Sequence, residues 1–234
     1  MTPGGAAVVG RRRAAAAAAV LLALAWAPAA AAQVRVRGFV QASHLRFTAS
    51  RSIEATTGSP TGAAYGGGGQ VGFGWLFVQG SIERYAAAGS RVFVLDDRVF
   101  DLGIPNRITI TPVRLTAGYR AGSRLAAYGG GGIGLYRFAE SAPFGPRAGR
   151  PDTAPEGATV PPLGPPYGDD VRDSHRGWHV LGGVETPLLR WLWIGGEGQW
   201  TWVPDALGAA GVSAAFGETD LGGFALRVKL SVGY

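Results

Sequence analysis

The sequence predicts an all-β protein, an eight-stranded antiparallel up-and-down transmembrane β-barrel. Two observations predict this class: eight segments alternate apolar with small or polar residues, and the connections between them are alternately long and short. A period of two is typical of β-strands, because successive side chains point to opposite faces. Long loops at one end and short turns at the other are typical of outer-membrane barrels.

The N-terminal segment lies outside the predicted fold. Three arginines at 11–13 precede an apolar run that ends at Ala27, and small alanines follow Pro28. This arrangement is that of a secretory signal peptide. A membrane anchor is the less favoured alternative, because the run is shorter than the ~20 residues that a spanning helix needs. We therefore predict a signal peptide at 1–32 and one barrel domain at 33–234.

Composition excludes several classes of protein. The net charge of +6 is halved when the three arginines at 11–13 are removed, and the remainder is too scattered to indicate nucleic-acid binding. The chain has no cysteine, so we expect no disulfide, no N-terminal lipid anchor and no thiolate metal site. Its histidines and acidic residues do not have the spacing of metal ligands, and we expect no cofactor.

The predicted strands follow one another after position 33. They lie at 34–48, 64–75, 76–85, 107–120, 125–138, 177–186, 191–202 and 221–234. In the first strand the apolar residues change faces between Ala42 and Leu45, which predicts a β-bulge near Ser43. Apolar residues continue beyond the third strand to Val94, so we predict a hairpin that protrudes from the membrane.

The last strand shows the alternation most clearly. Arg227 and Lys229 lie on one face, and the other face is apolar. The apolar face consists of Phe224, Leu226, Val228, Leu230, Val232 and Tyr234. We predict that this face contacts lipid and that Tyr234 lies at the membrane interface. The alternative is a soluble barrel or sandwich, but the polar faces carry too few charges to cover an outer surface.

The polar faces predict a charged lumen. Its predicted members are Glu83, Arg114, His179, Glu185, Glu197, Arg227 and Lys229. Buried charges need partners, and we expect Glu197 to pair with Arg227 or Lys229 on the neighbouring strand, or with His179. Eight strands enclose a space that side chains just fill, so a polar plug is favoured over an ion path.

Two other patterns have structural explanations. The sequence AAYGGGG occurs at 63–69 and again at 126–132, and the second copy matches the letters of a dinucleotide-binding fingerprint. No helix follows it, so we assign the glycines to close packing inside a small barrel. Ser174 and His175 follow Asp173 on a predicted loop, but sequence neighbours do not form a catalytic triad, and we predict no enzymatic activity.

The chain resembles the small OmpA/OmpX-like outer-membrane β-barrels of Gram-negative-type bacteria. The resemblance covers 33–234 and rests on the signal segment, the eight alternating strands, the terminal Tyr234 and the glycine-rich strand YGGGGIGLYR at 128–137. It implies location in the outer membrane. It also implies that the apolar face of the last strand is the recognition signal for the barrel-assembly machinery. The His-x-Ser motif of lipid A deacylases has no match here, and neither does a peptidoglycan-binding domain.

These observations favour a structural or surface-binding barrel with a plugged lumen. Its expected partners are outer-membrane lipid and lipopolysaccharide, with a surface ligand at the loops 49–62 and 139–176. An outer-leaflet lipid-modifying enzyme and a narrow passive channel stay open as alternatives.

Overall fold

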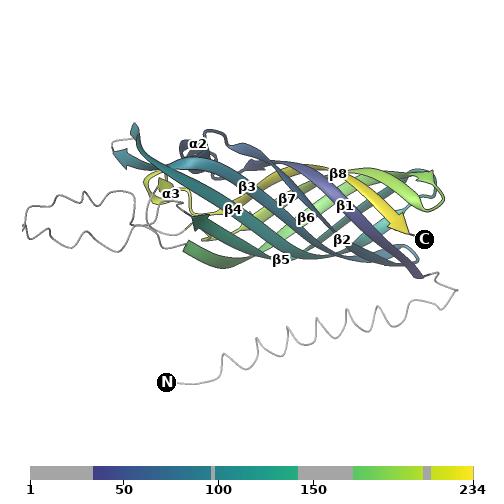
Figure 1. The fold of residues 1–234 in the computed structure, drawn as a ribbon. Helices are drawn as coiled ribbons and strands as arrows, with labels where there is room; N and C mark the ends of the chain where they lie inside the picture. The colour runs from purple at the N-terminus through teal and green to yellow at the C-terminus, as the bar shows by residue number, and fades with distance from the viewer. Residues whose placement is uncertain (1–33, 96–97, 142–170, 208–211, 234) are drawn as a thin grey trace, which may run out of the picture. The chain divides into compact units, whose positions relative to one another are not determined.

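The computed structural model describes residues 34–95, 98–141, 171–207 and 212–233. Within these ranges, eight strands form one closed ring in which each strand is antiparallel to its neighbours (Figure 1). The predicted fold class is therefore confirmed. The predicted signal peptide at 1–32, most of the proline-rich stretch and Tyr234 lie outside the described residues.

The strands follow the chain in order around the ring. They are β1 (Val34–Phe47), β2 (Thr61–Phe73), β3 (Leu76–Leu95), β4 (Arg98–Ala121), β5 (Ala126–Ser141), β6 (Val171–Leu189), β7 (Leu192–Val203) and β8 (Leu221–Gly233). Two short helices, α2 (Ser50–Thr57) and α3 (Val212–Ala215), follow β1 and precede β8. We call the end with the β2–β3, β4–β5 and β6–β7 turns the turn end, and the opposite end the loop end.

The predicted bulge near Ser43 is wrong. β1 pairs with β2 in unbroken register from Val34 opposite Phe73 to Arg46 opposite Thr61. The apolar residues change faces because the barrel interior itself becomes apolar toward the loop end. Phe47 is therefore buried inside, while Arg46 points outward.

Several strands extend further at the loop end than the alternation predicts. β4 begins at Arg98 and pairs with β3 as far as Leu95, so the two strands form the protruding hairpin seen in Figure 1. β5 and β6 likewise reach into the predicted irregular stretch 139–176, and the predicted loop 49–62 contains α2. Beyond the membrane both faces of a strand meet water, so pairing continues there without the apolar alternation that marks a spanning strand.

The outer surface of the barrel is apolar between two aromatic zones. Outward side chains such as Val40, Ile133 and Val228 are at least 60% exposed, which suits contact with lipid. The rings of Trp75 and Tyr119 stack at the turn end, with centroids 4.7 Å apart, and Trp178 and Trp202 pair toward the loop end. Within the described ranges, no helix is both long and apolar enough to cross a membrane.

The glycine runs lie where strands approach closely. A Cβ atom added to Gly132 would overlap the carbonyl oxygen of Leu115, and one added to Gly68 would overlap that of Gly80. Neither glycine has the positive φ that would itself require the residue. Close packing of neighbouring strands is therefore the role of these glycines.

Candidate functional site

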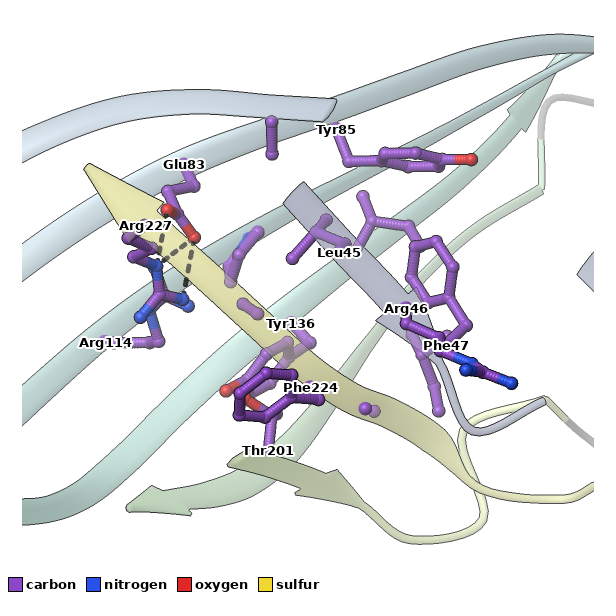
Figure 2. Close-up of a pocket in the computed structure, with 17 residues that line it drawn as sticks. Leu45, Arg46, Phe47, Glu83, Tyr85, Arg114, Tyr136, Thr201, Phe224 and Arg227 are labelled. Atoms are coloured by element: carbon purple, nitrogen blue, oxygen red, sulfur yellow. Dashed lines mark hydrogen bonds and ion pairs between the residues drawn. The ribbon is translucent and has the colours of Figure 1, made fainter. Parts of the chain in front are cut away.

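The barrel interior contains a network of buried charges centred on Glu83. Arg227 donates to both carboxylate oxygens of Glu83, from Nε at 2.9 Å and from Nη2 at 3.2 Å, and Arg114 donates to Oε2 (Figure 2). Gln41 Nε2 and Ser43 Oγ also donate to this carboxylate, at 2.8 and 3.2 Å. The three charged side chains are at most 3% exposed. Paired hydrogen bonds from arginine compensate for the lost hydration of such a buried carboxylate.

Glu197 forms the second centre of the network. It accepts from Arg227 Nη1 at 2.8 Å and from the Tyr128 hydroxyl at 3.1 Å. Lys229 Nζ lies 3.8 Å from Glu197 Oε2 and 4.4 Å from the centroid of the Tyr128 ring. Arg227 therefore links Glu83 to Glu197, and a cation–π contact supports the lysine.

Glu185 forms the third centre, near the turn end. Arg37 Nη1 donates to its Oε1 at 2.6 Å, and Arg120 Nε donates to the same oxygen at 2.7 Å. Both guanidinium groups lie against the ring of Trp193, at 4.1 and 4.8 Å from its centroid. One carboxylate is thus shared by two arginines.

His179 is buried, but its partner differs from the expected one. Its Nε2 lies 2.8 Å from Thr116 Oγ1. Strand register explains this: His179 pairs with Thr201 and Glu197 with Gly183, so the two side chains are four residues apart along the strands.

The structure buries all seven predicted lumen residues, and it adds members that the sequence analysis missed. The additional buried polar residues include Arg37, Gln41, Gln70, Gln79, Thr116 and Gln199, and Arg120 joins them as a largely buried side chain. The sequence does contain a pattern that indicates them, because each of these residues alternates along its strand with outward apolar or small residues. Arg37 and Gln41 lie on the polar face of β1, and the other residues lie on the polar faces of β2, β3, β4 and β7.

An apolar layer lies between this network and the loop end. Phe47, Tyr85, Ile110, Tyr136 and their neighbours form one buried cluster that also includes residues of α2 and of the segment after β7. A cavity of about 50 Å³ is lined by residues of this apolar layer together with Glu83 and Arg227, and Figure 2 shows its lining. Buried apolar side chains therefore occupy the loop end of the lumen.

Hydrogen bonds hold α2 over this layer. The Glu218 carboxylate accepts from the Ser52 backbone N–H at 2.8 Å and from the Ser52 hydroxyl at 2.6 Å. Nearby, the backbone N–H of Asp205 and the indole N–H of Trp202 lower the pKa of Asp220. Side-chain acceptors in the last loop thus tie down the loop end.

The catalytic candidates do not form a triad in the described residues. His175 Nε2 lies 3.2 Å from Asp173 Oδ2, but Ser174 contributes only its backbone N–H, which donates to Asp173. Neither His175 nor His179 shares a hydrogen bond with a serine hydroxyl in this part of the chain. The same ranges contain no group of three or more His, Cys, Asp or Glu residues that could hold a metal ion.

A closed ring of strands with an apolar exterior and a charged interior defines a transmembrane β-barrel. The family described as "outer membrane protein beta-barrel domain" matches residues 14–217, and the chain belongs to this family. The protein is therefore a small β-barrel of the bacterial outer membrane, which confirms the predicted location. The loop end of such a barrel faces outward and the turn end faces the periplasm.

Solved structures of other outer-membrane proteins are similar to this chain at low sequence identity. Neisserial surface protein A is 12% identical, with a TM-score of 0.48, and the match covers 85% of this chain and 97% of that one. The N-terminal barrel of Pseudomonas aeruginosa OprF is 11% identical, with a TM-score of 0.43, covering 86% and 100%. Ail of Yersinia pestis, solved with the heparin analogue sucrose octasulfate, is 9% identical, with a TM-score of 0.46, covering 86% and 97%. The comparison with curated proteins finds no match.

Replacing Glu83 by Gln should destabilise the barrel strongly, because Arg114 and Arg227 would lose their shared buried carboxylate. We expect a loss of about 3 kcal/mol in the free energy of unfolding, measured by urea titration of the protein refolded in vesicles. The control is Glu140→Gln. The Glu140 side chain is 29% exposed, and its Oε1 lies 3.9 Å from Nε of Arg91, so this ion pair is long and partly exposed to water. Equal stability of the two variants would contradict a central role for Glu83.

Proposed function

We propose that the protein is a structural and surface-contacting barrel with a plugged lumen. The observation that carries this proposal is the filling of the interior by two successive layers. The charged network occupies the centre, and the apolar cluster beneath α2 occupies the loop end. A lumen filled in this way favours a role as a membrane anchor over a role as a passive channel.

Outward arginines support contact with anionic lipid of the outer leaflet. Three arginines, Arg84, Arg137 and Arg176, are exposed on the outer surface. On each strand the arginine is the next outward residue toward the loop end after an apolar one: after Ile82, Leu135 and Trp178 respectively. Outside the β3–β4 hairpin, the outward positions of the described strands carry no carboxylate. We infer that this arginine belt, Arg84, Arg137 and Arg176, binds phosphate groups of lipopolysaccharide.

The protruding β3–β4 hairpin supports a second kind of contact, at the cell surface. Phe93 pairs with Phe100 across the two strands, and the side chains are 54% and 47% exposed. The barrel ring does not need these residues, because the other strands do not pair with them. We propose that the hairpin, together with the loops 49–62 and 139–176, forms the surface through which a ligand is bound.

A conductance recording is the most direct test of the plugged lumen. The refolded protein in a planar bilayer should give no step-like conductance under an applied voltage, because side chains of both layers fill the interior. An open porin-type barrel in the same bilayer is the control. Reproducible single-channel steps would favour the passive channel over the anchor.

Neutralising the arginine belt should weaken binding of lipopolysaccharide. The variant Arg84→Gln/Arg137→Gln/Arg176→Gln should need about tenfold more lipopolysaccharide for a half-maximal gel shift, since each exposed ion pair contributes about 0.5 kcal/mol. The control is Arg124→Gln/Arg190→Gln, which removes two exposed arginines from the turn end. An equal shift for both variants would refute the proposal that the arginine belt binds lipopolysaccharide.

We also propose that residues 1–32 direct export and that the outward face of β8 is the assembly signal. This face consists of Phe224, Leu226, Val228, Leu230 and Val232, all at least 39% exposed, with Tyr234 outside the described residues. Leu230→Ser/Val232→Ser should lower the amount of barrel in the outer membrane, while the purified variant still refolds in detergent. Normal assembly in cells would contradict this role.

A further inference from the structure

The barrel interior has more buried cations than carboxylates. Five cationic side chains, at most 8% exposed, face three carboxylates in the described residues. The cations are Arg37, Arg114, Arg120, Arg227 and Lys229, and the carboxylates are Glu83, Glu185 and Glu197. A buried charge without a counter-charge is unfavourable, so the excess positive charge calls for an anion.

Part of the excess lies near the turn end. Arg37 and Arg120 share Glu185, and Arg35 contributes a third guanidinium group beside them. These three arginines line a cavity of about 10 Å³ together with Gln70, which is enough space for one water-sized atom. We call this cavity with its three guanidinium groups the arginine pocket.

One donor of a residue that lines the arginine pocket has no acceptor. Nε of Arg37 is buried, and within the described residues it makes no hydrogen bond. The Arg37 side chain is only 5% exposed, so bulk water does not replace the missing acceptor. Buried donors in native proteins are nearly always satisfied by protein, ordered water or a ligand.

The protein holds the guanidinium groups in place before any ligand arrives. Arg37 and Arg120 lie against Trp193, and Arg35 donates to the carbonyl oxygen of Gly74 in the β2–β3 turn. The groups come from two strands, β1 and β4, on opposite sides of β2 and β3. Little side-chain freedom remains to be lost when an anion binds.

We propose that the arginine pocket binds a phosphate group that enters from the periplasm. Arginine presents a planar fork of donors that matches the oxygens of phosphate. The cavity has room for one such oxygen, and the apolar layer beneath α2 separates the pocket from the cell exterior. The phosphate can come from free inorganic phosphate or from a phospholipid headgroup of the inner leaflet, because the recognising chemistry is the same.

The experiment measures the thermal unfolding midpoint of the refolded full-length protein in uncharged detergent micelles. Inorganic phosphate replaces chloride at constant ionic strength, so that general screening is unchanged. We expect phosphate to raise the midpoint, and Arg35→Gln to need about tenfold more phosphate for the same rise, since a charge-assisted hydrogen bond is lost. Arg35 is the first choice because the ion pairs of Glu185 are made by Arg37 and Arg120, so that Arg35→Gln leaves both of them in place.

Two further variants are measured in the same way, one outside the pocket and one inside it. Arg190→Gln, at an exposed turn position, should respond to phosphate like the unmodified chain. Arg37→Lys keeps the charge but removes the free Nε donor, and it should also bind phosphate more weakly. If both pocket variants respond like the unmodified protein, phosphate acts elsewhere and the proposal is overturned.

A lipid arm separates the two sources of phosphate. The protein is refolded in uncharged micelles of a phosphate-free detergent with and without phosphatidylglycerol, and the midpoint is measured for the same variants. An Arg35-dependent rise with phosphatidylglycerol alone assigns the pocket to a lipid headgroup, and one with inorganic phosphate assigns it to the free ion. No rise in either arm, or an equal rise with chloride, would overturn the proposal and leave the plugged-lumen function untouched.

Discussion

The pairing of Glu83 with two arginines is the interaction on which the barrel interior depends. Glu83 lies on β3, Arg114 on β4 and Arg227 on β8. β8 is the strand that closes the ring against β1, far from β3 in the order of strands. The buried charges can therefore be satisfied together only when the barrel has closed. In this way one electrostatic requirement couples the folding of the last strand to that of the third.

The polarity of the barrel also changes along its length. The membrane demands an apolar exterior, so every charge in the spanning part must point inward or lie beyond the apolar band. Inside, the charged layer gives way to the apolar cluster that includes Phe47 and Tyr85. That cluster and α2 close the loop end, while positive charge gathers near the turn end. We propose that contacts with other molecules are made at the outer rim, at the hairpin and at the turn-end mouth.

The number of strands and their faces could be predicted from the sequence, because a period of two needs only local information. The alternation also indicated which way Arg227 and Lys229 point. Partners were harder to predict: the contact of His179 with Thr116 depends on the register of three strands, which no local pattern records. The extensions of β5 and β6 were missed because strands outside the membrane need no apolar face. Arg37 could have been found by reading the face opposite Val36.

A double-mutant cycle between Glu83 and Arg227 tests the central claim most directly. The free energies of unfolding in vesicles would be compared for the unmodified chain, Glu83→Gln, Arg227→Met and the double variant. We predict a coupling free energy of about 2 kcal/mol, because each single change leaves the partner's buried charge less compensated. Additive effects within about 0.5 kcal/mol would contradict the account. The Glu83–Arg227 pair would then contribute nothing to the stability of the barrel interior.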